Sequence, residues 1–184
     1  MAAADPIRTD RLLLRPITAD DLDYVHDVQS RSDVTRYLLF DVRNREEARQ
    51  ALLQKMQAPP PDREGGSLTL AVVLPATGAV IGDVVLFCRS EQHRQGEIGY
   101  IFHPDCAGRG YATEAARALL GLAFAEFGLH RITGRIDARN AASARVLQRL
   151  GMRLEAHFAQ NEFIKGEWTD EIVYAILDHE WKPR

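Results

Sequence analysis

The sequence predicts a mixed α/β fold with the element order β-α-α-β-β-β-α-β-α-β-β. Short β-rich runs separated by turns indicate a mostly antiparallel sheet, and a strand, a helix and a second strand follow one another between Glu97 and Ile136. A crossover helix between two strands makes those strands parallel, so we expect one central parallel pair. Since 46% of the 184 residues are apolar, we expect one domain with a sizeable core over residues 1–184.

The first half of the chain predicts a strand, two helices and a β-hairpin. Three leucines precede Pro16 in a short strand, and Thr18 with acidic residues after it is typical of a helix start. Three prolines and two glycines exclude regular structure from the loop 58–66. The expected elements are a strand at 11–15, a helix after Thr18, a helix at 45–56, and strands at 68–74 and 80–88.

The second half predicts a third strand of this meander, followed by two helices and three more strands. Gly128 and Gly151 follow apolar helical faces and are typical of helix C-caps, and Gly166 marks a turn between two long strands. The expected elements are strands at 97–102, 131–136, 153–165 and 169–178, a helix ending near 127 and a helix at 141–150.

The most informative segment is residues 106–116, a glycine-rich turn between a strand and a helix. Gly108 and Gly110 allow a tight turn that points successive N–H groups into one spot, and the helix start adds its own free N–H groups. This arrangement predicts a site for a phosphate or pyrophosphate. Tyr111 after Gly110 excludes a P-loop, and Thr113 stands where a dinucleotide fingerprint has its third glycine. A glycine turn with no ligand remains the alternative.

Composition excludes several other classes of protein. A net charge of −3 and scattered arginines give no footprint for nucleic acid. Cys88 and Cys106 form no disulfide framework, Cys88 is expected to be a buried apolar residue, and the six histidines show no metal-binding spacing. Residues 1–6 do not resemble a signal peptide, and no apolar run approaches the ~18 residues of a membrane span. We therefore expect a cytoplasmic protein without a metal.

The order of elements and the glycine turn together resemble the GNAT superfamily of acyl-CoA-dependent N-acetyltransferases. Within it, the sequence Gly-Tyr-Ala-Thr-Glu-Ala at 110–115 is similar to the branch of Rim-type ribosomal-protein alanine N-acetyltransferases. The matching segments cover most of the chain, between about residues 9 and 181. They are residues 9–16, 98–100, 108–115, 140–143, 150–152 and 166–170, with Tyr174.

The resemblance implies the GNAT fold and acetyl-CoA as cosubstrate. By this resemblance, the pyrophosphate binds the N–H groups of the turn, formed by Gly108, Arg109, Gly110, Tyr111, Ala112 and Thr113. The pantetheine arm lies along Ile101, Phe102 and His103, as a short strand would. Asn140 contacts the arm from the other side, unless it is a plain helix N-cap.

Two positions depart from the family pattern. Many members carry Gln or Arg where this chain has Asp105, and an acid beside a pyrophosphate is unfavourable unless its side chain points away. Many also carry a tyrosine that protonates the leaving thiolate, at the position that is Leu147 here. That general acid is absent.

Two residues are the candidates for the chemistry. Glu97 heads its strand and shares a face with Gly99, which leaves space for an amine or a bridging water; a solvated strand-end glutamate is the alternative. Ser143 lies one helical turn after Asn140, close to the expected sulfur, although a first-turn serine is as ordinary. An N–H on the strand after Ile98 is expected to bind the oxyanion, judging by the family.

The acceptor is less constrained by the sequence. The leading hypothesis is acyl transfer to a primary amine, either a protein N-terminus or a small molecule such as a polyamine or antibiotic. A non-catalytic acyl-CoA-binding domain is an alternative from another class. Tyr37, Leu38 and Phe40 form the apolar cluster expected to wall the acceptor pocket, with Trp168 as a further candidate. Glu114 is expected to brace the loop, and the exposed strands at the C-terminus favour a homodimer.

Overall fold

The computed structural model describes residues 5–182, and within them one eight-stranded mixed sheet with the order β1-β2-β3-β4-β5-β6-β8-β7. Every neighbouring pair is antiparallel except β5 and β6, which confirms the expected parallel pair. The strands are β1 (Ile7–Arg8), β2 (Leu13–Pro16), β3 (Ser67–Val73), β4 (Val80–Ser90), β5 (Gln95–Phe102), β6 (Arg131–Asp137), β7 (Arg153–Ile164) and β8 (Glu167–Leu177). The helices are α1 (Leu22–Gln29), α2 (Ser32–Thr35), α3 (Arg45–Gln57), α4 (Tyr111–Ala125) and α5 (Ala141–Arg149).

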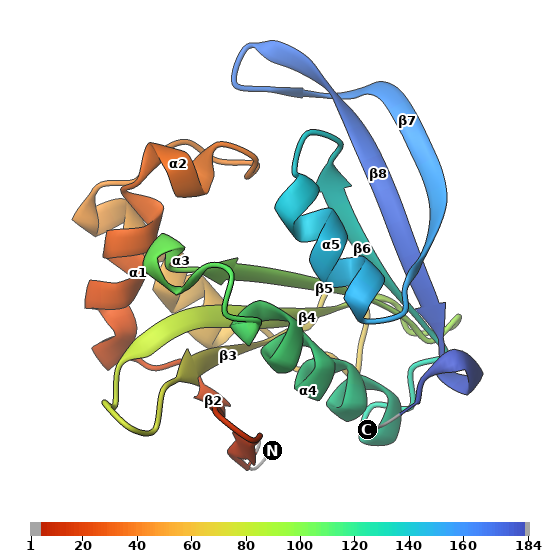
Figure 1. The fold of residues 1–184 in the computed structure, drawn as a ribbon, viewed down its shortest axis with the longest axis horizontal. Helices are drawn as coiled ribbons and strands as arrows, with labels where there is room; N and C mark the ends of the chain where they lie inside the picture. The colour runs from red at the N-terminus through yellow and green to blue at the C-terminus, as the bar shows by residue number, and fades with distance from the viewer. Residues whose placement is uncertain (1–4, 183–184) are drawn as a thin grey trace.

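Helices cover both faces of the sheet (Figure 1). On one face, α4 buries a stripe of alanines and leucines, among them Ala115 and Leu119, against Val84 and Ile98 of the sheet. On the other face, Val25 of α1 and Leu52 of α3 form a smaller cluster. Cys88 is buried, as expected, and no helix among residues 5–182 is long and apolar enough to cross a membrane.

The sequence did not predict two short elements, the two-residue strand β1 and the one-turn helix α2. The strand expected at 11–15 lies two residues later and includes Pro16. Ile17 donates its N–H to Thr69 of β3, so the nitrogen of the preceding Pro16 faces the other side of β2, where β1 lies. The pairing with β1 extends only to Leu13 and Leu14 and does not include Pro16. Proline is tolerated there because no ladder hydrogen bond is lost. Residues 1–4, on which the expectation about a signal peptide partly rests, lie outside the described part.

The helix and strand boundaries in the C-terminal half differ from the expected ones by at most two residues. Helix α4 ends at Ala125 with Glu126 as its C-cap, so Gly128, at φ +57°, follows the helix rather than capping it. Gly151, at φ +86°, does follow the Leu150 cap of α5 in the left-handed conformation. The β7–β8 hairpin is long and reaches beyond the rest of the sheet (Figure 1).

The central strands separate after a short paired stretch. β5 and β6 are paired only from Gln95–Glu97 to Arg131–Thr133, although β5 continues to Phe102 and β6 to Asp137. The unpaired halves therefore border a gap in the sheet. Its β5 side ends at the glycine turn.

Candidate active site

The glycine turn has the geometry of an anion site. Gly108 and Gly110 have φ values of +75° and +81°, a conformation that glycine adopts without steric cost. Gly110 is the N-cap of α4 and provides no side chain to bond the first turn. The N–H groups of Tyr111, Ala112 and Thr113 precede the first intrahelical bond, which runs from Glu114 N–H to the Gly110 carbonyl. These free donors and the positive end of the helix dipole favour a phosphate.

Glu114 ties this turn to the N-terminal segment, as expected. Its carboxylate accepts hydrogen bonds from the Thr9 hydroxyl at 2.6 Å, and from the Arg11 backbone N–H and Nε at 2.9 and 2.7 Å. Arg11 in turn donates from Nη1 to the Arg109 carbonyl at 3.0 Å. Burial opposes ionisation of Glu114, but the bonds from Thr9 and Arg11 outweigh it and lower its pKa. Glu114 therefore braces the loop.

The Asp105 side chain is exposed to solvent and is not part of the cavity wall beside the glycine turn. Its side chain is 82% exposed and lies 3.7 Å from Nδ1 of His103. His103 Nδ1 accepts the Asp105 N–H, and its Nε2 lies 3.0 Å from Asp27. Asp105 does not line the cavity of about 470 Å³ that borders the glycine turn.

The free edge of β5 supplies peptide groups to the gap. His103 donates its N–H to Ile81 of β4, so by the alternation of an antiparallel ladder Ile101 also bonds to β4. Tyr100 and Phe102 then point their peptide groups toward the gap, beyond the last residues paired with β6. Of the three residues expected along the pantetheine arm, Phe102 thus offers its backbone, whereas Ile101 and His103 only line the cavity.

The start of α5 borders the gap from the other strand. Asn140 is an N-cap, because its Oδ1 accepts the Ser143 N–H at 3.0 Å, and it also lines the cavity beside the glycine turn. The plain N-cap interpretation and the cofactor interpretation of Asn140 are therefore compatible.

The hydroxyl of Ser143 is bonded to a tyrosine that the sequence did not single out. Ser143 Oγ donates to Tyr100 Oη at 3.0 Å, and Tyr100 Oη donates to the Ser143 carbonyl at 3.2 Å. Burial raises the pKa of Tyr100 to about 12, so this hydroxyl keeps its proton at neutral pH. Leu147, at the position of the missing family tyrosine, is buried against Gly134 and lies in the apolar core. Tyr100 is thus the phenol that accompanies Ser143.

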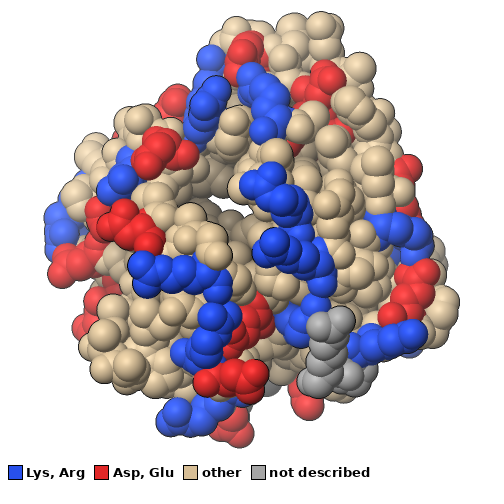
Figure 2. Space-filling model, viewed as in Figure 1, with Lys and Arg blue, Asp and Glu red and all other residues tan. Residues whose placement is uncertain are grey.

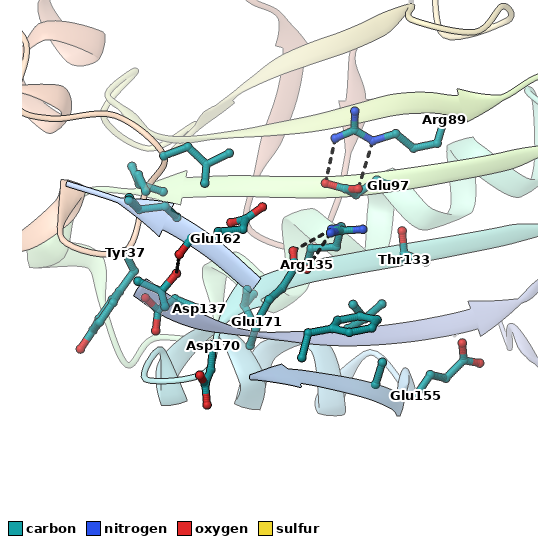
Figure 3. A pocket seen from close by; sticks show the side chains of 18 of the residues that line it. Tyr37, Arg89, Glu97, Thr133, Arg135, Asp137, Glu155, Glu162, Asp170 and Glu171 are labelled. Carbon is teal, nitrogen blue, oxygen red and sulfur yellow. Dashed lines mark hydrogen bonds and ion pairs between the residues drawn. The ribbon is translucent and has the colours of Figure 1, made fainter. Parts of the chain in front are cut away.

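Glu97 lies where β5 and β6 separate, on the wall of a cavity of about 810 Å³ (Figure 3). Its two oxygens each accept a hydrogen bond at 3.0 Å from Arg89. Arg135 of β6 is paired with Glu171 of β8 at 2.6 Å in the same cavity. Burial lowers the pKa of Arg135, but the hydrogen bonds that it donates to Glu171 and the nearby negative charges outweigh burial and raise the pKa.

A third, mostly apolar cavity of about 320 Å³ borders β5 at Gly99. A Cβ atom at position 99 would lie 3.1 Å from Val85 Cγ1, so a side chain there would crowd the cavity. Among its lining residues are Tyr37, Leu38 and Phe40, the cluster expected to wall the acceptor pocket. Trp168 does not line these cavities, because it is 60% exposed and packs on Phe163 at a ring separation of 5.3 Å.

The sheet is thus divided between β5 and β6, and a turn suited to an anion lies where β5 ends. The chain belongs to the GNAT family: the family model "Acetyltransferase (GNAT) domain" matches residues 11–153.

Relatives and solved structures agree with this assignment. The N-acetyltransferase YnaD of Bacillus subtilis, itself uncharacterized, is 35% identical over 95% of this chain and 98% of its own length. Spermidine N(1)-acetyltransferase of Escherichia coli K12 is 27% identical over 91% of this chain and 87% of its own. The crystal structure of a GNAT acetyltransferase from Bacillus anthracis, 34% identical, superposes with a TM-score of 0.85 over 95% of this chain and 99% of that chain. The fold and the enzyme class expected from the sequence are confirmed.

Proposed function

We propose that this protein transfers the acetyl group of acetyl-CoA to a primary amine at the gap between β5 and β6. One observation carries the proposal. The free N–H groups of the glycine turn and the unpaired peptide groups of Tyr100 and Phe102 follow one another along a single strand end. Phosphates at one end and an amide-containing arm along the strand fit this row of donors and acceptors.

The chain's own groups suit acyl transfer. When bound, acetyl-CoA supplies an activated thioester carbonyl. The Tyr100 N–H, the first free one after Ile98, stabilises the developing oxyanion. Ser143 hydrogen-bonds the departing sulfur, whose pKa as a thiol is near the ~8.5 of cysteine. This contact requires only that the two hydroxyl groups turn. Ser143 Oγ then donates to the sulfur, and Tyr100 Oη donates to Ser143 Oγ instead of to the Ser143 carbonyl.

Glu97 accepts the proton of the amine, directly or through a water. Arg89 occupies one lone pair on each oxygen, and a carboxylate has about four acceptor positions, so two remain for the substrate. An α-amino group has a pKa of about 7.7–8.0 and a lysine about 10.4. The demand on Glu97 is therefore small for an α-amine and large for an alkyl amine.

A protein N-terminus is the leading acceptor, and a small polycationic amine is the second. The second is favoured by the wall of the larger cavity, where the Glu162 carboxylate has no direct ion pair or hydrogen bond in the described part of the chain and acts on Arg135 only through its charge (Figure 3). It is also favoured by the spermidine acetyltransferase among the relatives. The apolar cavity at Gly99 favours instead an amine with an apolar neighbour.

The test is thiol release from acetyl-CoA across a panel of peptides with N-terminal alanine, polyamines and aminoglycosides. We expect turnover with at least one class and a thermal shift with CoA but not with ATP or NAD. Tight CoA binding without turnover on the whole panel would support the non-catalytic alternative. A cytoplasmic location and a homodimer are further proposals, tested by cell fractionation and by light scattering of the purified protein.

A further inference from the structure

Two arginines of α5 line the cavity beside the glycine turn without an ion-pair partner. Arg145 and Arg149 are four residues apart, so they lie on one helix face, and both border the cavity of about 470 Å³ together with Gly108 and Gly110. Within residues 5–182 neither guanidinium has a carboxylate or hydrogen-bond acceptor. By contrast, Arg131 and Arg135 of the preceding strand are both in ion pairs.

The surface around this cavity is basic on the α5 side. Figure 2 shows a central hollow in this face, with Lys and Arg side chains along its border over α5. Helix α5 carries no acidic residue. The excess positive charge of Arg145 and Arg149 is therefore available to an anion in the cavity.

The glycine turn cannot neutralise all of the charge that coenzyme A carries. Its free N–H groups suit the pyrophosphate, but coenzyme A also bears a 3′-phosphate monoester with a charge of about −1.5 to −2 at neutral pH. The groups near the turn place little further positive charge in the cavity. Asp105 is acidic, Arg11 is paired with Glu114 at 2.6 Å, and Arg109 is exposed and does not line the cavity. A cationic group that lines the cavity would stabilise the monoester.

We propose that Arg145 and Arg149 form the subsite for the 3′-phosphate of coenzyme A and so distinguish it from dephospho-CoA. Two guanidinium groups offer paired N–H donors that match phosphate oxygens, and such charge-assisted bonds are stronger than neutral ones. This inference rests on the proposed function, since it requires coenzyme A in the cavity.

Isothermal titration of the wild type with CoA and with dephospho-CoA tests the subsite without measuring activity. We expect CoA to bind at least about tenfold more tightly. The variant carrying both Arg145→Gln and Arg149→Gln should lose that preference, with dephospho-CoA affinity changed less than about twofold. Arg8→Gln is the control, because Arg8 is exposed, lies outside the cavity and has no ion pair with another residue of the described range 5–182.

Three results would overturn the inference. Equal binding of the two ligands by the wild type would exclude a 3′-phosphate subsite. An equal loss of affinity for both ligands in the double variant, with circular dichroism unchanged, would assign the arginines to the pyrophosphate instead. Binding of neither ligand by the wild type would reject the proposed function together with the subsite.

Discussion

The hydroxyl groups of Ser143 and Tyr100 lie 3.0 Å apart and join the first turn of α5 to the free half of β5. Tyr100 also donates to the Ser143 carbonyl, so the two residues are doubly connected across the gap. Leu147, one turn further along α5, is buried and offers no hydroxyl. Ser143 is thus held at a fixed position beside the expected sulfur.

Tyr100→Phe should lower kcat by about tenfold while the Kd for CoA stays within about twofold, because one orienting hydrogen bond is lost but the backbone of β5 is kept. Ser143→Ala should have a similar effect, and the double variant should be no slower than the worse single one. Tyr174→Phe is the control, since its hydroxyl bonds only Gln148. Fully additive losses would contradict a coupled pair.

Glu97→Gln should lower kcat with little change in acetyl-CoA affinity. General-base contributions are about 10² to 10⁴-fold, and an α-amine acceptor should give a value at or below the lower end. The pH dependence of kcat/KM on the best amine measures this. A variant with wild-type kcat and an unchanged pH profile would remove Glu97 from catalysis, and positioning alone would then carry the reaction.

Gly108→Val and Gly110→Val should each raise the KM for acetyl-CoA by about tenfold or more, because a β-branched residue resists the left-handed conformation and obstructs the N–H donors. Gly78→Val is the matched control, since Gly78 also has a positive φ, of +73°, with open space around it but lies in the β3–β4 turn. The Tm measures the loss of stability that backbone strain causes, and the KM for acetyl-CoA from steady-state kinetics measures the loss of binding. Gly110→Val with wild-type CoA affinity would exclude the phosphate assignment.

Glu114 should make the loop acid-sensitive. Its pKa is lower in the folded protein than its ordinary value of 4.5, so the unfolded state binds the proton first as the pH falls. The stability that Glu114 contributes is therefore complete above pH 4.5 and is lost as the pH falls through the folded-state pKa. A Tm series from neutral to acidic pH should show a smaller decrease for Glu114→Gln. An identical decrease in both proteins would contradict this.

The glycine turn was predictable because its signal is local. Gly108, Gly110 and the helix that follows are adjacent in sequence, and the conformations they need belong to glycine itself. The parallel pair was predictable for a similar reason. A strand, a crossover helix and a second strand in succession form a right-handed unit whose two strands are parallel.

The contacts across the gap were not predictable from one sequence. Tyr100 and Ser143 are 43 residues apart, and nothing in the pattern of β5 distinguishes a tyrosine that packs on α4 from one that reaches α5. Glu97 was chosen for its place beside Gly99, but its partner Arg89 depends on the register of β4 and β5. Helix α2 was missed because four residues carry no helical periodicity.

Mass spectrometry of the amine after incubation with acetyl-CoA tests the proposed transfer most directly. With wild-type protein we expect one acetyl group on the amine nitrogen and one free CoA thiol for each product formed, and both should fall together in the Gly110→Val variant at limiting acetyl-CoA. Acetyl-CoA that binds at the glycine turn but yields no acetylated product with any amine of the panel would contradict an acetyltransferase at this site.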